Sequence, residues 1–166
     1  MNGFRVAIIT ASDMGYAGRR EDISGPVIRE LVEAHGYRVA YTVVLPDDRE
    51  LLSREIARIC DQGTAELLLT TGGTGFSPRD CMPEATAAVM ERMVPGIPEA
   101  MRLFSLKYSQ RSMLSRAVAG IRGRTLVVNL PGSPKAVREN LEYVIPTLEH
   151  GLEMLLGEGS ANCARS

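Results

Sequence analysis

The residues best suited to chemistry follow a short apolar run, the three leucines at positions 67–69. The loop after this run carries three glycines and two threonines, and glycines let a backbone approach a ligand closely and expose consecutive N–H groups to an anion. In the same loop Arg79 can pair with phosphate oxygens, and Asp80 can hold the magnesium ion that accompanies a nucleotide. The loop lacks the lysine of a Walker motif and the spacing of a dinucleotide fingerprint, so it predicts an anion site of unspecified type. The candidates here are Thr71, Gly72, Gly73, Thr74, Gly75 and Arg79 for binding, and Asp80 for catalysis and metal binding.

Asp47 is the second candidate carboxylate, and it has two interpretations. It stands three residues before Glu50, which is the spacing of a capping box, so a purely structural role as a helix cap is open. We favour a catalytic and metal-binding role, because a helix N-terminus beside the glycine loop would also suit a ligand. Its neighbour Asp48 is expected to face solvent.

Polar residues also follow other expected strands. For Ser12 and Asp13, which follow the first expected strand, ligand binding and a purely structural role in the loop are equal alternatives. In a later strand-to-helix turn, Ser133 is expected both to cap the following helix and to face the pocket. Ser112 stands in a segment that leads into a strand and is a further candidate for substrate contact. These additional binding candidates are Ser12, Asp13, Ser112, Pro131, Gly132 and Ser133.

Hydrophobic periodicity predicts the elements that position these loops. Alternating strands and helices predict a three-layer α/β/α single domain, with a mainly parallel sheet and an antiparallel edge hairpin. Ligands of such sheets bind beyond the carboxyl ends of the strands, where the polar loops fall. Pro146 is expected to kink the last helix or divide it in two. The expected strands span 6–9, 37–45, 67–70, 116–121 and 125–130, and the expected helices span 24–35 with Ser24 as cap, 47–59, 83–93, 97–108 and 135–155.

Size and composition limit the remaining possibilities. The 166 residues (18.1 kDa) suit one domain over 1–156, and the small, polar tail 157–166 is expected to be disordered. A net charge of −1 without a dense Lys/Arg cluster argues against nucleic-acid binding, and no apolar run has the roughly 20 residues needed to cross a membrane. The first residues lack the pattern of a signal peptide, and three cysteines without metal-like spacing predict a reduced, cytoplasmic setting.

The loop motifs form a specific pattern when they are read together. They are Ser12-Asp13, Gly18, Asp22, Ser24-Gly25, Pro46-Asp47-Asp48, the loop 71–75, Arg79-Asp80, Pro83-Glu84-Ala85, Leu114-Ser115-Arg116 and the segment 129–134. Each motif alone is common, but their order and spacing over nearly the whole chain resemble the MoaB/MogA family of molybdenum cofactor biosynthesis proteins.

The resemblance implies a single α/β domain that adenylylates molybdopterin with MgATP and releases pyrophosphate. It implies that Asp47 and Asp80 are the catalytic, Mg²⁺-holding acids and that the glycine loop cradles phosphate. A homotrimer is expected, with a hexamer as the alternative, and a molybdenum-inserting protein is the expected recipient of the product. Apolar residues on more than one face of the helix 97–108 support subunit contacts. These residues are Leu103, Phe104, Leu106 and Tyr108.

One departure from the family pattern keeps a second function open. The family usually reads Arg-Asp-Val-Thr-Pro-Glu-Ala, whereas this chain has Cys81-Met82 in place of Val-Thr. The missing threonine would cap the following helix, and we expect Asp80 to take over that cap. A non-catalytic molybdopterin-binding scaffold is therefore the alternative to the enzyme. A flavodoxin-like redox module is disfavoured, because acids in the glycine loop would repel a flavin phosphate.

Overall fold

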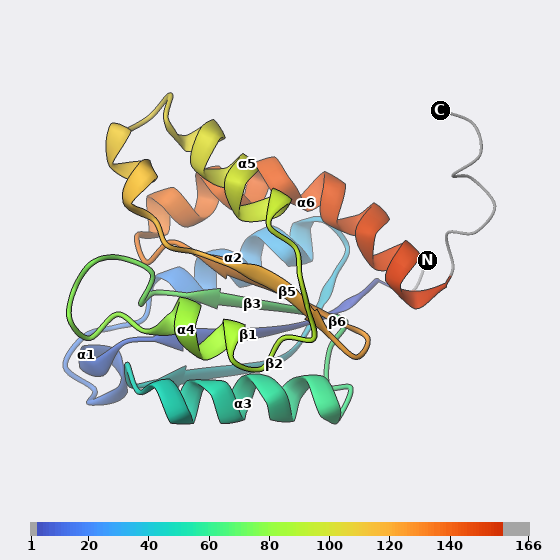
Figure 1. Cartoon of the computed structure of the whole chain (residues 1–166), viewed down its shortest axis with the longest axis horizontal. Coiled ribbons are helices and arrows are strands. Elements are labelled where there is room, and N and C mark those ends of the chain that lie inside the picture. The colour runs from blue at the N-terminus through green and yellow to red at the C-terminus, as the bar shows by residue number, and fades with distance from the viewer. Residues whose placement is uncertain (1–2, 158–166) are drawn as a thin grey trace.

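The computed structural model describes residues 3–157 and contains one six-stranded sheet (Figure 1). The strands lie in the order β2 (Arg38–Leu45), β1 (Arg5–Ala11), β3 (Leu67–Thr71), β6 (Thr125–Leu130), β5 (Ala119–Arg122) and β4 (Arg92–Met93). The first four of these run parallel, whereas β5 is antiparallel to β6 and β4 is antiparallel to β5. The expected sheet, mainly parallel with an antiparallel edge, is confirmed.

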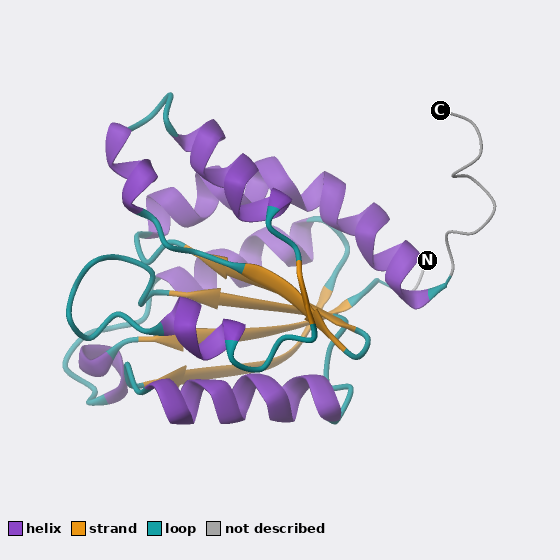
Figure 2. Cartoon of the chain, viewed as in Figure 1, coloured by secondary structure: helices purple, strands orange, loops and turns teal. Residues whose placement is uncertain are grey.

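Helices cover both faces of the sheet and give three layers (Figure 2). One face carries α2 (Ser24–Ala34), α5 (Gly96–Ser105) and α6 (Pro134–Leu156), and the other carries α3 (Arg49–Asp61) and α4 (Met82–Ala87). Two short segments, α1 (Asp13–Tyr16) and the 3-10 helix η1 (Gln110–Leu114), complete the order. Within the described chain no helix combines the length and apolar character needed to span a membrane.

The central strands are mainly apolar because both of their faces are covered. Val6 and Ile8 of β1 pack in the cluster with α2 and α6, while Ala7 and Ile9 pack in the cluster with α3 and α4. A strand buried on both sides shows no alternation of apolar and polar residues, which is typical of parallel sheets. The short apolar runs of the sequence thus mark the strands whose ends carry the polar loops.

The helix expected over 83–93 is wrong in its second half. It ends at Ala87, and Arg92–Met93 form the edge strand β4. The N–H of Glu91 bonds to the carbonyl of Ile121 at 2.9 Å, and that of Val94 bonds to the carbonyl of Ala119 at 2.9 Å. Pairing with a strand that is distant in sequence therefore overrides the local helical spacing, which extended to Val89, Met90 and Met93.

Other boundaries also move. The helix expected to reach 108 ends at Ser105, and the strand expected from 116 begins at Ala119. Of the kink or division expected at Pro146, the division is wrong, because α6 is continuous over 23 residues and buries Ile145 and Leu148 on either side of the proline. Burial of that face compensates for the backbone donor that proline lacks. The expected domain end at 156 coincides with the end of α6, and 158–166 of the expected disordered tail lie outside the described residues.

Asn129 ties three parts of this scaffold together from a fully buried position on β6. Its Nδ2 donates to the hydroxyls of Thr70 (2.9 Å) and Thr86 (3.0 Å), and its Oδ1 accepts from the backbone N–H of Val118 (3.2 Å). The amide thereby links β3, α4 and the approach to β5. The hydroxyls of Thr70 and Thr86 belong to fully buried residues, and both would lose this hydrogen bond if the amide were removed.

We expect Asn129→Ala to lower the free energy of unfolding by about 2–4 kcal/mol, because it orphans buried polar groups and opens a small cavity. Chemical denaturation monitored by circular dichroism measures this loss. Gln62→Ala is the matched control, since the Gln62 amide bonds to Arg58 at an exposed site and should change the free energy by less than about 0.5 kcal/mol. Equal losses in the two variants would contradict the role given to Asn129.

Candidate active site at the carboxyl ends of β1, β3 and β6

Three loops meet where β1, β3 and β6 end, and Gly72 is the point of contact. Its φ is +89°, and a side chain there would collide with the carbonyl oxygen of Ala11, while a Cβ on Gly132 would touch the Gly72 Cα at 3.4 Å. Only glycine satisfies both the backbone conformation and the space. The hydroxyl of Thr71 donates to the carbonyl of Pro131 at 2.6 Å and so links the end of β3 to the loop after β6. The sequence candidates from separate loops are therefore brought together.

Asp47 is not the cap of α3, so that interpretation of it is wrong. The cap is Asp48, whose carboxylate accepts from the N–H of Leu51 at 2.9 Å. Asp47 instead exchanges two hydrogen bonds with Asp13: its Oδ2 accepts from the Asp13 N–H at 3.1 Å, and its own N–H donates to Asp13 Oδ1 at 3.0 Å. Its side chain is thereby turned from the helix towards the glycine loop.

Two carboxylate oxygens near the glycine loop are buried without a hydrogen-bond partner in the described residues, Asp47 Oδ1 and Glu84 Oε2. Asp47 Oδ1 lies 3.0 Å from the position that a Cβ on Gly73 would take. Burial raises the pKa of Asp47, and the negative charges of Asp13 and Asp80 raise it further. An unsatisfied buried carboxylate oxygen of this kind is a candidate ligand for a cation.

Arg79 and Asp80 approach Asp47 from the loop after β3. Arg79 donates through Nε and Nη2 to the two oxygens of Asp13, both at 3.0 Å, and this ion pair holds the pKa of Asp13 below its usual range. Asp80 Oδ2 accepts from the N–H of Ser77 at 3.0 Å, so the expectation that Asp80 caps α4 is wrong. Asp13, Asp47, Arg79 and Asp80 therefore form one charged cluster.

The cluster suits a magnesium ion that is shared with a substrate. No set of three or more His, Cys, Asp or Glu side chains that could hold a metal by themselves occurs in the described part of the chain. Mg²⁺ in nucleotide sites usually has one or two carboxylate ligands and takes the rest from phosphate and water. The free Oδ1 of Asp47 and the nearby Asp80 provide this donor set.

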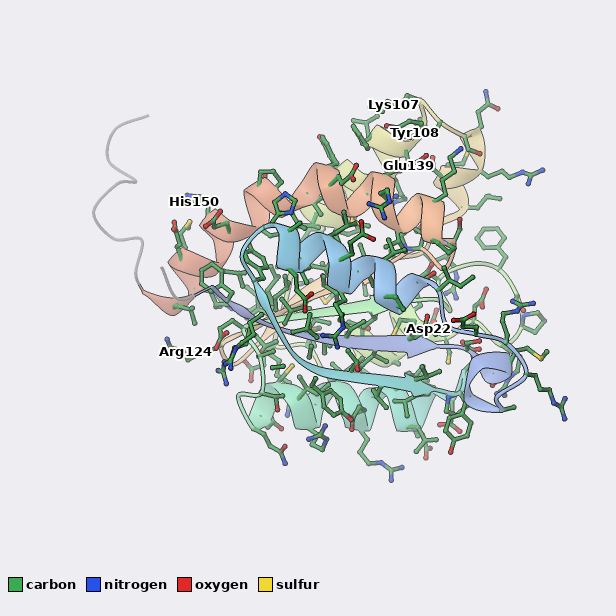
Figure 3. All side chains as sticks on the ribbon, turned by 180° about the vertical axis from the view of Figure 1, so that it is seen from behind. Asp22, Lys107, Tyr108, Arg124, Glu139 and His150 are labelled. Atoms are coloured by element: carbon green, nitrogen blue, oxygen red, sulfur yellow. The ribbon has the colours of Figure 1, made fainter. Side chains whose placement is uncertain are left out.

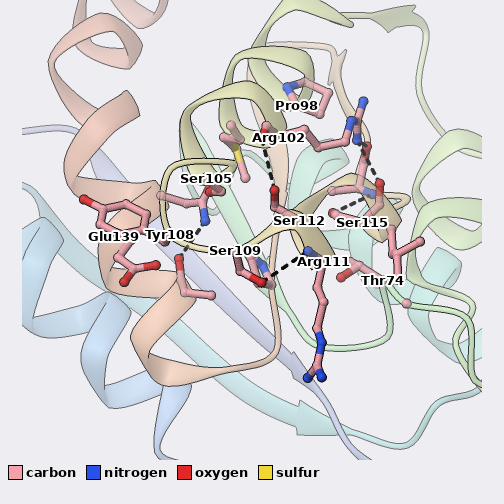
Figure 4. Close-up of a pocket in the computed structure, with 17 residues that line it drawn as sticks. Thr74, Pro98, Arg102, Ser105, Tyr108, Ser109, Arg111, Ser112, Ser115 and Glu139 are labelled. Atoms are coloured by element: carbon pink, nitrogen blue, oxygen red, sulfur yellow. Dashed lines mark hydrogen bonds between the residues drawn. The ribbon is translucent and has the colours of Figure 1, made fainter.

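Two cavities flank the glycine loop. A polar one of about 460 Å³ lies between the loops after β1, β3 and β6, and a more apolar one of about 290 Å³ lies under α5 and η1 (Figure 4). The first is lined by the candidates Ser12, Thr71, Gly72, Gly132 and Ser133, and the second by Thr74, Gly75, Ser112 and Pro131. Gly73 stands between them in sequence, near Oδ1 of Asp47. The candidates Asp13, Asp47, Arg79 and Asp80 are not among the residues that line either cavity.

Several residues of the site were missed as functional candidates. Asp22 is buried in part at the polar cavity (Figure 3); it accepts from Thr10 Oγ1 (2.9 Å) and from the N–H of Gly25 (3.0 Å). The expectation that Ser24 caps α2 is wrong, because Ser24 is the first helical residue and donates to the carbonyl of Gly132 at 2.7 Å. Arg20 also lines this cavity. The spacing of Asp22 and Gly25 was the signal available in the sequence.

Arg116 holds the far end of the glycine loop and was likewise missed. Its guanidinium donates to the carbonyls of Gly75 (2.7 Å) and Asp80 (3.0 Å) and pairs with Glu84. Its backbone N–H also donates to the carbonyl of Thr74 at 2.9 Å. A side chain from the segment before β5 thus fixes a loop that lies about forty residues earlier in the chain. Both Arg116 and Glu84 stand in motifs quoted above without an assigned role.

Comparison with known proteins decides the family of this chain. A family model described as "Probable molybdopterin binding domain" matches residues 7–150. The chain belongs to this molybdenum cofactor biosynthesis family. A molybdopterin adenylyltransferase of Helicobacter pylori is 40% identical over 159 residues, covering 95% of this chain and 90% of that protein, and the Escherichia coli K12 protein of the same name is 36% identical over 147 residues, covering 87% and 75%.

Solved structures of the family share the fold. The molybdopterin biosynthesis enzyme MoaB from Thermus thermophilus superposes with a TM-score of 0.88 at 45% identity, covering 93% of this chain and 97% of that one. A structure titled as MogA superposes with a TM-score of 0.86 at 36% identity, covering 91% of this chain and 99% of that one. The resemblance to MoaB/MogA proteins inferred from the loop motifs is thus confirmed.

We expect Asp47→Asn to raise the melting temperature at pH 7 in Mg²⁺-free buffer. Burial raises the pKa of Asp47 in the folded state above its ordinary value of 3.8, so ionising it costs folding free energy as the pH rises through the raised pKa. Below pH 3.8 the carboxyl is protonated in both states, so the difference between wild type and variant should vanish there. Thermal unfolding followed at several pH values measures the difference in melting temperature between wild type and variant. A stabilisation that is independent of pH would contradict the electrostatic cause, and Asp48→Asn, which keeps an exposed cap, is the control.

Proposed function

We propose that the protein is a molybdopterin adenylyltransferase that uses MgATP. The observation that carries this proposal is the buried Oδ1 of Asp47, which has no hydrogen-bond partner among residues 3–157 and faces the glycine loop near Asp80. Relatives of this chain bear the name of that enzyme. The two carboxylates would hold Mg²⁺, and the phosphates would lie against the backbone N–H groups of the loop 71–75.

The reaction is a transfer of AMP. The terminal phosphate of molybdopterin attacks the α-phosphorus of ATP, the bond to the β-phosphate oxygen breaks, and pyrophosphate leaves with the electron pair. The attacking phosphate is already ionised at neutral pH, so this chain needs to align the two substrates and shield their charges rather than remove a proton. Mg²⁺, when bound, neutralises charge on the leaving phosphates. Asp47 and Asp80 would hold this ion through their carboxylates, and Arg79 adds a positive charge at the loop.

The two cavities accommodate the two substrates. The cavity under α5 and η1 is lined by Pro98 and Met101 with a few polar groups such as Ser112, which suits a flat heterocycle that hydrogen-bonds at its edge (Figure 4). The other cavity offers the hydroxyls of Ser12 and Ser133, with Asp13 beside it in the chain, and suits a polar nucleotide. On this basis Ser112 and Pro131 contact one substrate, and Gly132 and Ser133 contact the other.

The substitution at Cys81-Met82 leaves the enzymatic proposal intact. Met82 is fully buried, and its backbone N–H donates to the carbonyl of Gly73 at 3.0 Å. This bond fixes the glycine loop and needs no hydroxyl at position 82. The side-chain cap of α4 is indeed lost, since Cys81 makes no capping hydrogen bond. A scaffold that binds molybdopterin without turnover remains the second candidate, because one polar group of the family pattern is missing.

Pyrophosphate release from ATP and molybdopterin tests the proposal. We expect Asp47→Asn and Asp80→Asn each to reduce the rate by about 100-fold or more, because each removes one of the two carboxylates that would hold Mg²⁺ with the nucleotide. Circular dichroism should show both variants folded. The matched control is Asp48→Asn, which keeps a good helix cap next to the site and should retain the wild-type rate. Molybdopterin binding without pyrophosphate release by the wild type would favour the scaffold.

The cellular setting follows from the proposed reaction. ATP, Mg²⁺ and molybdopterin are cytoplasmic substrates in this proposal, and the adenylylated product would pass to a molybdenum-inserting protein. Helix α5, η1 and the turn between them expose Leu103 (71%), Tyr108 (50%) and Met113 (61%). Phe104 stacks on Tyr143 of α6, with ring centroids 3.9 Å apart. Figure 3 shows Lys107 and Tyr108 on this corner of the molecule. Such exposed apolar side chains support subunit contacts.

We expect a homotrimer, in which this apolar surface is buried between subunits. Multi-angle light scattering at micromolar concentration should give about three times the chain mass of 18.1 kDa. Leu103→Glu should lower that mass by placing a charge in the contact, whereas Glu30→Gln on the exposed face of α2 should not. A wild-type monomer under these conditions would contradict the prediction, and twice the expected mass would identify the hexamer.

A further inference from the structure

Both carboxylate oxygens of Asp13 accept hydrogen bonds from other residues of the protein. Oδ1 accepts from the N–H of Asp47 and from Arg79 Nη2, both at 3.0 Å, and Oδ2 accepts from Arg79 Nε at 3.0 Å. The N–H of Asp13 donates to Asp47 Oδ2 at 3.1 Å. A carboxylate used in this way has little capacity left for a ligand. This argues against the direct ligand contact considered for Asp13 from the sequence.

We propose that Asp13 is a positioning residue that acts through Asp47 and Arg79. The inference rests on the proposed function, since it explains how the groups assigned to catalysis are oriented. On one side, the reciprocal hydrogen bonds fix the carboxylate plane of Asp47, so that Oδ2 is occupied and Oδ1 faces Gly73. On the other side, two parallel hydrogen bonds fix the guanidinium of Arg79 and leave its Nη1 without a partner in residues 3–157.

The position of Asp13 in the chain makes it suitable for this role. It begins the short helix α1 directly after β1, while Asp47 lies in the loop after β2 and Arg79 in the loop after β3. One side chain thus joins the carboxyl ends of three adjacent strands. Asp13 itself is held by its neighbour Ser12, whose Oγ accepts from the N–H of Gly15 at 2.9 Å and whose N–H donates to the carbonyl of Leu45 at 2.9 Å. Asp13 therefore connects Asp47 and Arg79 to the ends of the sheet strands and limits their movement.

A positioning role and a direct contact with substrate predict different kinetics. If Asp13 orients Asp47, its loss should lower kcat and leave KM for ATP and for molybdopterin unchanged, since ligand contacts remain. If Asp13 bound a substrate, its loss should raise KM for that substrate. The Asp13–Arg79 pair is exposed (63% for Arg79 and 41% for Asp13), so neither role requires a large change in stability.

The test compares Asp13→Ala with Asp13→Asn in the full chain. Asp13→Ala should lower kcat by about 100-fold, because it releases Asp47 from its orientation. Asp13→Asn keeps an oxygen that can accept from the Asp47 N–H, so it should recover most of that loss. Asp61→Ala is the matched control; it removes an exposed Arg–Asp pair with two hydrogen bonds of 2.8 and 2.9 Å to Arg122, and should leave kcat unchanged.

A second readout does not depend on turnover. Hydrogen exchange of the Asp47 backbone amide, followed by NMR in the free protein, should be faster in Asp13→Ala and protected in wild type and Asp13→Asn. Unchanged exchange in Asp13→Ala, or a raised KM with an unchanged kcat, would overturn the positioning role. If the wild type releases no pyrophosphate, the proposed function fails, and the exchange measurement still decides whether Asp13 holds Asp47.

Discussion

The close contact between the ends of β1, β3 and β6 is the constraint on which the site depends. Parallel pairing places the last residues of these strands in register, with Thr10 beside Thr71 and Thr71 beside Leu130. The chain then turns at Gly72 with a positive φ, against the carbonyl of Ala11 and next to Gly132. A side chain at Gly72 would push these loops apart, and the groups that approach one another across them would lose their partners. The geometry of the site therefore requires a residue without a Cβ atom at position 72.

Electrostatics at this contact favour a ligand that brings its own cation. Three carboxylates, Asp13, Asp47 and Asp80, gather around one nearby guanidinium, and that guanidinium is already paired with Asp13. A free phosphate would meet net negative charge there, whereas a phosphate carrying Mg²⁺ would relieve it. Burial is the main cause of the raised pKa of Asp47, and the negative charges of Asp13 and Asp80 add to it. An acidic cluster beside a phosphate-binding loop is therefore consistent with MgATP as the substrate and difficult to reconcile with an anion alone.

The sequence predicts what depends on local pattern, and less of what depends on distant partners. The central strands and the glycine turn follow from apolar runs and from residues with strong backbone preferences, and they were correct. Asp47 and Asp48 differ by one position as candidates for the cap of α3, and hydrophobic periodicity does not locate a helix start to one residue. Asp48 is the cap, because Asp47 is instead hydrogen-bonded to Asp13, which is distant in the sequence. Edge strand β4 exists because β5 supplies its partners. Arg116 acts on a loop forty-one residues earlier, a relation that no spacing rule contains.

The glycine loop also works as a partition between two compartments. Gly72 lines the polar cavity, while Thr74 and Gly75 line the more apolar one, and the short stretch between them faces Asp47. A reaction that joins two bound molecules requires separate sites whose reactive ends meet, and entropy already lost on binding then lowers the barrier. Backbone bonds from Met82 to Gly73 and from Arg116 to Thr74 hold the partition from both sides. Because both anchors are backbone donors, the position of the partition does not depend on the side chain at position 82.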